Sequence, residues 1–283
     1  IQFDYNFAKV KGNIYSNQRN HQAELVLSKE NKKAKIDGKD VLKISEYVGY
    51  LNVVVFVPDD LSLVKGSPST RRKFIDLELS KISPIYAFYL AKYNRLLKER
   101  NQYLKLLSKK NGKYDDYLET IDEQMVDVQL KVIEKRENFI ERLSKNVKDV
   151  YKSIADNEEY VDLHYLCFIK KKDKEELLKL YKKEFSRDLK YLSTTHGIHK
   201  EDMKIMIDRK SAHQYASQGQ QRTIVLSIKI ALLELIKEEI GEYPILLLDD
   251  VLSELDDQRK TKLLDILNNR IQTFITTTSI DGI

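Results

Sequence analysis

The chain has 283 residues, of which 33% are charged and 42% are hydrophobic, and this length and composition indicate a soluble, helix-rich protein with a sizeable core in one or two domains. Its formal net charge of +5 permits a nucleic-acid partner without requiring one. The single cysteine excludes an internal disulfide, and no apolar run approaches the roughly 18–20 residues of a membrane span, so we expect a cytoplasmic protein with no membrane partner.

The first part of the chain, residues 1–57, is predicted to be β structure. Residues 1–10 and 22–28 alternate apolar and polar side chains, which is the pattern of a half-buried strand. Asp37-Gly38 is a strong signal for a hairpin turn. A continuous apolar run at residues 53–57 predicts a buried strand, which a proline ends.

The next part, residues 59–156, is predicted to be a helical lobe. Pro84 opens one long helix, and a polar turn at residues 108–113 separates it from a second. Apolar side chains recur every three or four positions along both helices, so we expect the two to pack antiparallel, like a short coiled coil. An ordinary helical subdomain is the simplest interpretation of this part.

Helices and strands alternate after residue 157, which favours α/β structure with a parallel sheet. Strands are predicted at residues 161–169, 203–208 and 273–276, and residues 199–202 are expected in an exposed loop. The sequence therefore predicts three parts: a β-rich part of the core (1–58), the helical lobe (59–156) and a second part of the core (157–283).

The most informative segment begins with Ser217-Gln218-Gly219-Gln220 and continues into an apolar helix. A polar turn that leads into a helix can bind phosphate, because free backbone N–H groups and the positive helix end favour an anion. Ser217 would offer a hydroxyl group and Gly219 an unhindered N–H to a γ-phosphate. Gln218 and Gln220 are polar enough to line a hydrated interface. The simpler alternative is that Ser217 only caps the helix.

A short apolar strand ends in two acids, Asp249 and Asp250. Side chains that follow a buried strand emerge where ligands bind in α/β folds. Asp249 is therefore a candidate to hold Mg²⁺, mostly through water. The alternative for Asp249 is an acid that caps the turn after the strand. Asp256, a few residues further on, is expected to cap the next helix.

Clusters of basic side chains are candidate contacts for DNA phosphates. For each cluster, the alternative is an ordinary solvated face. The strongest candidates are Arg71, Arg72 and Lys73, and the pair Lys109 and Lys110.

A phosphate-cradling loop of the pattern G-x-x-x-x-G-K-[ST] is not found in the sequence. Gly38-Lys39 and Gly112-Lys113 lack the earlier glycine, and neither pair is followed by Ser or Thr. The chain begins with Ile1 inside a strand pattern and ends without a terminal helix. We therefore expect that pieces of the natural protein are missing at both ends, the phosphate loop among them.

Taken together, these segments resemble the RecF family of bacterial ABC-type ATPases, which is related to the SMC heads. The resemblance rests on residues 216–223 and 244–257, supported by residues 56–76, 197–202 and 274–283, and it extends over essentially the whole chain. It implies an α/β fold of the ABC-type ATPase head, in which a β-rich N-terminal part and a parallel sheet carry an inserted helical lobe.

The resemblance also implies roles for the candidate residues. Ser217, Gln218, Gly219 and Gln220 would form the signature that binds ATP across a dimer. Asp249 would be the metal-side acid, Asp250 the hydrolytic acid and Asp256 an acid of the dimer loop. Two departures from ABC-type ATPases are visible: Asp250 stands where such ATPases usually have a glutamate, which predicts slow turnover, and threonines at 276–278 stand near an expected histidine.

The function implied by the resemblance is that of an ATP- and Mg²⁺-dependent DNA-binding protein of recombinational repair and replication restart, within the SOS response to DNA damage. Such proteins form homodimers on ATP, prefer single-strand/double-strand DNA junctions, and help load a recombinase together with RecO and RecR. Slow ATP hydrolysis is expected only for the complete protein with its phosphate loop. The alternatives are a nucleotide-independent DNA-binding scaffold and another SMC-like ATPase head.

Overall fold

The computed structural model describes residues 5–16, 19–41, 51–110, 112–155, 158–252, 255–267 and 270–277. The chain divides into two compact units, one of residues 1–58 and 229–283 and the other of residues 59–228. Residues 157–228 thus group with the helical residues that precede them, while the division into three functional parts stays a prediction.

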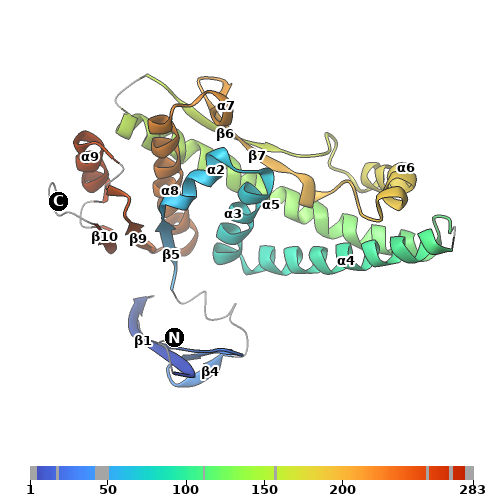
Figure 1. The fold of residues 1–283 in the computed structure, drawn as a ribbon, viewed down its shortest axis with the longest axis horizontal. Coiled ribbons are helices and arrows are strands. Elements are labelled where there is room, and N and C mark those ends of the chain that lie inside the picture. Colours follow the sequence, from blue (N-terminus) through green and yellow to red (C-terminus); the bar gives the residue numbers. More distant parts are fainter. Residues whose placement is uncertain are drawn as a thin grey trace. The chain divides into compact units, whose positions relative to one another are not determined.

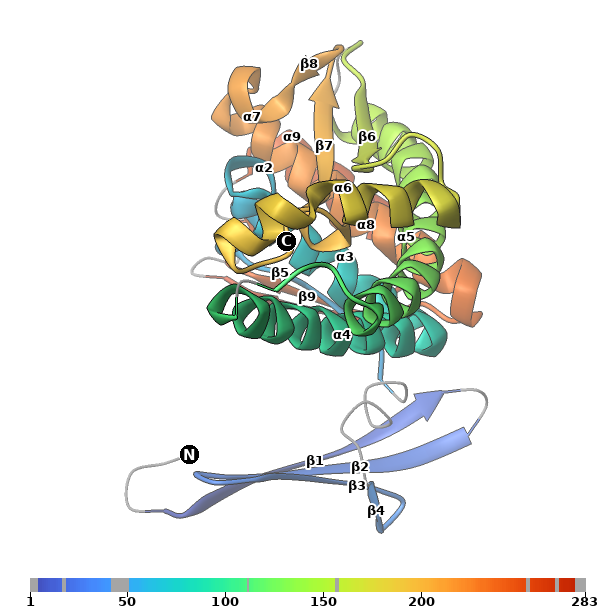
Figure 2. The ribbon, with the colours of Figure 1, turned by 90° about the vertical axis from the view of Figure 1, so that its right-hand side faces the viewer.

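The first unit contains a four-stranded antiparallel sheet in the order β1-β2-β3-β4 (Figure 2). Its strands are β1 (Phe7–Ser16), β2 (Arg19–Ser28), β3 (Lys32–Ile36) and β4 (Lys39–Val41). The predicted turn between the last two is confirmed: Asp37 and Gly38 have φ angles of +50° and +80°. Asp and Gly tolerate this left-handed conformation, and it matches the twist of a tight hairpin. Residues 1–4 of the predicted first strand lie outside the described residues.

A parallel three-stranded sheet, in the order β10-β9-β5, belongs to the same unit. Its strands are β5 (Val53–Phe56), β9 (Ile245–Asp249) and β10 (Thr273–Thr276), with α9 (Asp257–Leu267) between the last two in the chain. Leu246 and Leu248 on the central strand are each 1% exposed, as expected for a strand that is covered on its faces. The predicted parallel sheet is confirmed.

Helix α8 (Gln218–Ile240) contains the boundary between the two units. Its residues from Thr223 to Leu233 are all buried, so this stretch of the helix is covered on every side. Lys229 lies on this buried stretch and donates a hydrogen bond from Nζ to the carbonyl oxygen of Val55 (2.7 Å). In the described part of the chain, no helix is both long enough and apolar enough to cross a bilayer.

The second unit is built on two long helices that lie side by side, α4 (Pro84–Lys109) and α5 (Asp116–Ala155) (Figure 1). Buried side chains such as Tyr93, Leu96 and Leu104 recur at helical spacing along their contact. The predicted antiparallel pair is confirmed. The short elements η1 (Pro58–Leu61) and α2 (Ser62–Lys65) and the helix α3 (Pro68–Ile82) precede it.

An antiparallel sheet in the order β6-β7-β8 packs on α5 through β6 (Figure 2). Its central strand buries Met203, Ile205 and Ile207 on one face. The elements of this region are β6 (Val161–Leu166), α6 (Lys174–Tyr191), η2 (Ile198–Lys200), β7 (Asp202–Ile207), β8 (Lys210–Ser211) and α7 (Ala212–Tyr215).

Candidate functional site

The first turn of α8 is held by a capping box. Ser217 Oγ accepts a hydrogen bond from the backbone N–H of Gln220 (3.2 Å), and Gln220 Oε1 accepts one from the backbone N–H of Ser217 (2.7 Å). The predicted cap is therefore confirmed. Within the described residues, the backbone N–H groups of Gln218 and Gly219 have no hydrogen-bond acceptor. Two free donors at the positive end of a long helix are suited to an anion.

The side chain of Gln220 is fixed from the other side by Glu159. Gln220 Nε2 donates a hydrogen bond to Glu159 Oε1 (2.7 Å), and the Tyr151 hydroxyl donates to Glu159 Oε2 (3.0 Å). Gln221 is 6% exposed and donates from Nε2 to the carbonyl oxygen of Ala216 (2.7 Å). These two glutamines therefore shape the turn, whereas Gln218 is exposed.

Asp249 and Asp250 follow one another at the carboxyl end of β9. The Thr276 hydroxyl on the neighbouring strand donates a hydrogen bond to Asp249 Oδ1 (2.5 Å). The backbone N–H of Asp250 lies 3.1 Å from both Oγ1 and the carbonyl oxygen of Thr276. Asp250 has a φ angle of +52°, a left-handed conformation that aspartate tolerates better than most residues. The end of β10 thus orients the first acid and the backbone of the second.

An exposed carboxylate at this edge of the sheet has the chemistry that Mg²⁺ requires. The ion keeps most of its water and is bound by one or two carboxylates together with phosphate oxygens. Asp249 is exposed and supplies one such carboxylate. No cluster of three His, Cys, Asp or Glu side chains that could hold a metal occurs among the described residues. The residues present therefore fit an ion that takes its other ligands from nucleotide and water.

Asp256 forms the N-terminal cap of α9. Its Oδ1 accepts a hydrogen bond from the backbone N–H of Arg259 (2.9 Å), and its Oδ2 lies 3.1 Å from Arg259 Nη1. The predicted cap is confirmed, and the role of Asp256 in a dimer loop stays a prediction. Residues 253–254 of the same loop, and Thr278 after β10, lie outside the described residues.

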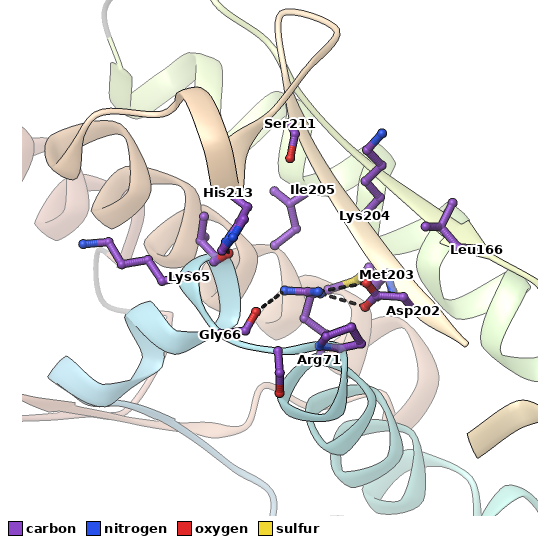
Figure 3. Close-up of a pocket in the computed structure, with 13 residues that line it drawn as sticks. Lys65, Gly66, Arg71, Leu166, Asp202, Met203, Lys204, Ile205, Ser211 and His213 are labelled. Atoms are coloured by element: carbon purple, nitrogen blue, oxygen red, sulfur yellow. Dashed lines mark hydrogen bonds and ion pairs between the residues drawn. The ribbon is translucent and has the colours of Figure 1, made fainter. Parts of the chain in front are cut away.

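The guanidinium groups of Arg71 and Arg72 are bound within the second unit. Arg71 makes a bidentate ion pair with Asp202 (2.7 and 2.8 Å) and donates to the carbonyl oxygen of Gly66 (2.8 Å) (Figure 3). Arg72 Nη1 donates to the carbonyl oxygen of Glu201 (2.6 Å). Both contacts favour a structural role, so DNA contact by these two arginines stays a prediction. The other three candidates, Lys73, Lys109 and Lys110, are exposed.

Residues 199–202 were expected in an exposed loop, and this expectation is wrong. Glu201 is 2% exposed and accepts hydrogen bonds from Arg136 Nη1 (3.2 Å) and from the Tyr165 hydroxyl. Arg136 Nη2 also contacts Asp76 Oδ1 (2.7 Å). Burial raises the pKa of Glu201, while the Arg136 guanidinium opposes that rise. Glu201 is buried where it accepts hydrogen bonds from groups on segments that are distant in the sequence.

A cavity of about 430 Å³ lies between α2, the start of α3 and the strands β7 and β8. Arg71 and Asp202 meet at its wall, whereas Lys65 and Lys204 extend away from this pair (Figure 3). The cations that line the cavity therefore do not converge on one point, and the cavity is not built like a phosphate site.

No family model matches the sequence. The chain is 42% identical over 290 residues to the DNA replication and repair protein RecF of Staphylococcus carnosus (strain TM300), covering 100% of this chain and 78% of the relative. It is 41% identical to the protein of the same name from Geobacillus sp. (strain WCH70), with the same coverage. The chain belongs to the RecF family.

Solved structures agree with this assignment. The recombination mediator protein RecF with ATP, from the RecFOR pathway, matches 99% of the chain and 77% of its own length, with a TM-score of 0.90 and 35% identity. An SMC head bound to the C-winged-helix domain of ScpA has a TM-score of 0.53 at 13% identity, and so shares the fold alone. The predicted α/β fold, that of an ABC-type, SMC-like ATPase head, is confirmed.

Two residues of the candidate site were missed in the sequence, Thr276 and Glu159. Thr276 was noted only as a hydroxyl near an expected histidine, although strand pairing places it directly beside Asp249. The sequence signal that could have identified Thr276 was that both parallel strands, β9 and β10, end in polar residues. Glu159 is 61 positions from Gln220, and no local pattern connects them.

Proposed function

We propose that this RecF-family chain acts as an ATP- and Mg²⁺-dependent DNA-binding protein of recombinational repair and replication restart, which dimerises on ATP. The observation that carries the proposal is the pair of free backbone N–H groups, of Gln218 and Gly219, beside the Ser217 hydroxyl at the start of α8. The solved RecF structure with ATP supports nucleotide binding by a relative of the same fold.

Some of these residues would bind the γ-phosphate of the nucleotide, and others would promote hydrolysis of ATP. Gln218 and Gly219 would donate their backbone N–H groups to γ-phosphate oxygens of a nucleotide held by a second protomer. Bound Mg²⁺ would supply positive charge to the phosphates. Asp249 would accept hydrogen bonds from metal-bound water, and Asp250 would orient or deprotonate the attacking water.

The partners follow from the family. One solved relative is described as a recombination mediator of the RecFOR pathway, and the curated relatives are DNA replication and repair proteins. We therefore assign to this chain DNA with single-strand/double-strand junctions, RecO and RecR as partners, a role in recombinase loading, and a place in the cytoplasm.

The test is nucleotide-dependent dimerisation of the complete protein. A γ-phosphate-stable ATP analogue with Mg²⁺ should raise the dimer fraction measured by light scattering. Ser217→Ala should lower that rise, because the first turn loses its hydroxyl and its cap. Ser83→Ala removes the cap of α4, where Ser83 Oγ accepts from the N–H of Tyr86 (3.3 Å), and should leave the rise unchanged. No rise in the unaltered protein at saturating analogue would overturn the proposal.

A DNA-binding scaffold without a working ATPase is the second candidate. Asp250 favours it, since its side chain is one methylene shorter than that of glutamate and reaches a water less well. This candidate predicts a DNA affinity that is equal with and without nucleotide and falls with added salt.

A further inference from the structure

Helix α4 carries its buried and its charged side chains on opposite faces. Tyr93, Leu96, Arg100, Leu104 and Leu107 are buried against the rest of the unit. The opposite face is exposed and follows the same alternating spacing of three and four positions, which keeps its members in one row. That row consists of Arg95, Lys98, Gln102, Lys105 and Lys109.

The four cations of this row have no ion-pair partner within the described residues. The single acid of α4 is Glu99, which lies beside the row and accepts a hydrogen bond from the Tyr117 hydroxyl (2.9 Å). Lys110 adds a further exposed cation at the end of the helix. The outer face of α4 is therefore positive from Arg95 to Lys110.

The neighbouring surface of α5 and α6 differs, because several of its lysines are paired with acids. Lys174 Nζ lies 2.9 Å from Asp127 Oδ1, and Lys182 Nζ lies 2.5 Å from Glu119 Oε1. Lys172 contacts Glu137 in the same way. Positive charge is thus balanced between α5 and α6 and left unbalanced on α4.

The dimensions of the row suit a duplex. Arg95 and Lys109 are 14 positions apart, which is about 21 Å along a helix. One DNA strand carries about six phosphates over the same axial length. The row has no aromatic member, and Leu106 (53% exposed) is its apolar neighbour. Protein interfaces usually depend on buried aromatic or apolar anchors, so the charge pattern favours nucleic acid over an acidic protein.

We propose that the outer face of α4, from Arg95 to Lys109, binds the phosphate backbone of the double-stranded part of a DNA substrate. This inference rests on the DNA binding proposed above and assigns it to a surface. Lysine and arginine side chains on a straight helix contact phosphates without reading bases, so binding is independent of sequence and sensitive to salt.

The experiment compares two double variants of the complete protein with equal changes in charge. Lys98→Glu with Lys105→Glu alters the α4 row. Lys131→Glu with Lys179→Glu alters exposed lysines of α5 and α6, where side-chain exposures are 58% and 71%. Affinity for a fluorescent duplex is measured at several salt concentrations, with the ATP analogue present, after thermal melts have shown that both variants are folded.

The α4 variant is expected to bind at least about tenfold more weakly, and the slope of log K against log salt should become less steep by about 1.8, since each phosphate contact contributes about 0.9. The control variant should keep the slope of the unaltered protein. Equal losses in both variants would mean that only net charge matters and would overturn the inference.

The other outcomes separate this inference from the proposed function. If the unaltered protein binds duplex and the α4 variant binds equally well, the surface is wrong while DNA binding stands. If the unaltered protein binds no DNA with or without nucleotide, both proposals fail. If the α4 variant keeps its DNA affinity but loses an acidic protein partner, the row is a protein interface and the inference is overturned.

Discussion

Glu159 connects the chain just after α5 to the first turn of α8 through a side-chain hydrogen bond from Gln220. A hydrogen bond to a charged acceptor stabilises by about 1.5–3 kcal/mol. Glu159→Ala should therefore loosen the turn and lower the analogue-induced dimer fraction several-fold, as measured by light scattering. Glu159→Gln keeps an acceptor for Gln220 and should largely preserve dimerisation.

Glu158 provides the matched control for this change, because it is the adjacent acid and is exposed. Glu158→Ala should leave the dimer fraction unaltered. A Glu159→Ala protein that dimerises like the unaltered one would show that the contact with Gln220 does not position the first turn of α8.

His199 is held neutral by its surroundings. Nε2 donates to the carbonyl oxygen of Thr194 (3.0 Å), so Nδ1 accepts from the Tyr93 hydroxyl (2.7 Å). Burial lowers the pKa of His199 to about 4, from an ordinary value of 6.5, and the charges of Lys200 and Arg72 act in the same direction. Protonation of Nδ1 would place a second N–H donor opposite the Tyr93 hydroxyl, which donates its hydrogen to Nδ1 in the neutral state.

The sign of the pH dependence follows from this lowered pKa. The unfolded chain binds a proton below about pH 6.5 and the folded chain only near pH 4, so stability is full above pH 6.5 and falls as the pH drops. We expect a loss on the order of 2 kcal/mol between these values, measured by urea unfolding. His199→Gln should flatten this dependence, whereas His164→Gln, at an exposed position, should not. If His199→Gln lost as much stability at low pH as the unaltered protein does, the attribution of this pH dependence to His199 would be wrong.

At the scale of elements, α4 and α5 are joined by a buried ionic cluster around Arg100. Arg100 contacts Asp122 Oδ1 (2.5 Å), Asp188 Oδ2 (2.6 Å) and Thr194 Oγ1 (2.9 Å), and its guanidinium lies 4.8 Å from the centre of the Tyr181 ring. The cluster links α4 to α5 and to the C-terminal end of α6. All three charged members are at most 1% exposed.

Removing the cation from this cluster should be costly. Arg100→Met leaves two buried carboxylates without a counter-charge, so we expect a loss of about 3–5 kcal/mol in the free energy of unfolding, measured with urea. Arg95→Met, on the exposed face of the same helix, should change it by less than about 0.5 kcal/mol. Similar losses in the two variants would show that the ionic cluster does not hold the hairpin.

Elements were more predictable than the contacts between them. The apolar spacing predicted α4 and α5, and turn chemistry predicted the hairpin at Asp37-Gly38. Arg100 lies on the buried face of α4, but its partners Asp188 and Thr194 are 88 and 94 positions away. Pairing over such distances depends on the fold and leaves no local pattern.

At the scale of the whole molecule, the sequence was sufficient to predict the two helix caps of the candidate site. It was not sufficient to predict the contacts between segments that are distant in the chain. Ser217 and Asp256 cap their helices through contacts three positions along the chain. Residues 71–76 and 197–202, in contrast, meet through Arg71 and Asp202, which are 131 positions apart. Sequence similarity indicated that these two segments belong to the family, and the structure adds that ion pairs and hydrogen bonds join them.

The ionic cluster in the helical hairpin has a mechanical consequence. Two helices joined by apolar contacts alone can shift past each other by one turn, about 5.4 Å, and find similar contacts again. In this hairpin the same shift would separate Arg100 from Asp122 and leave both charges buried and unpaired. The ion pair therefore fixes the register of the α4–α5 hairpin, because sliding by one turn would separate two buried charges.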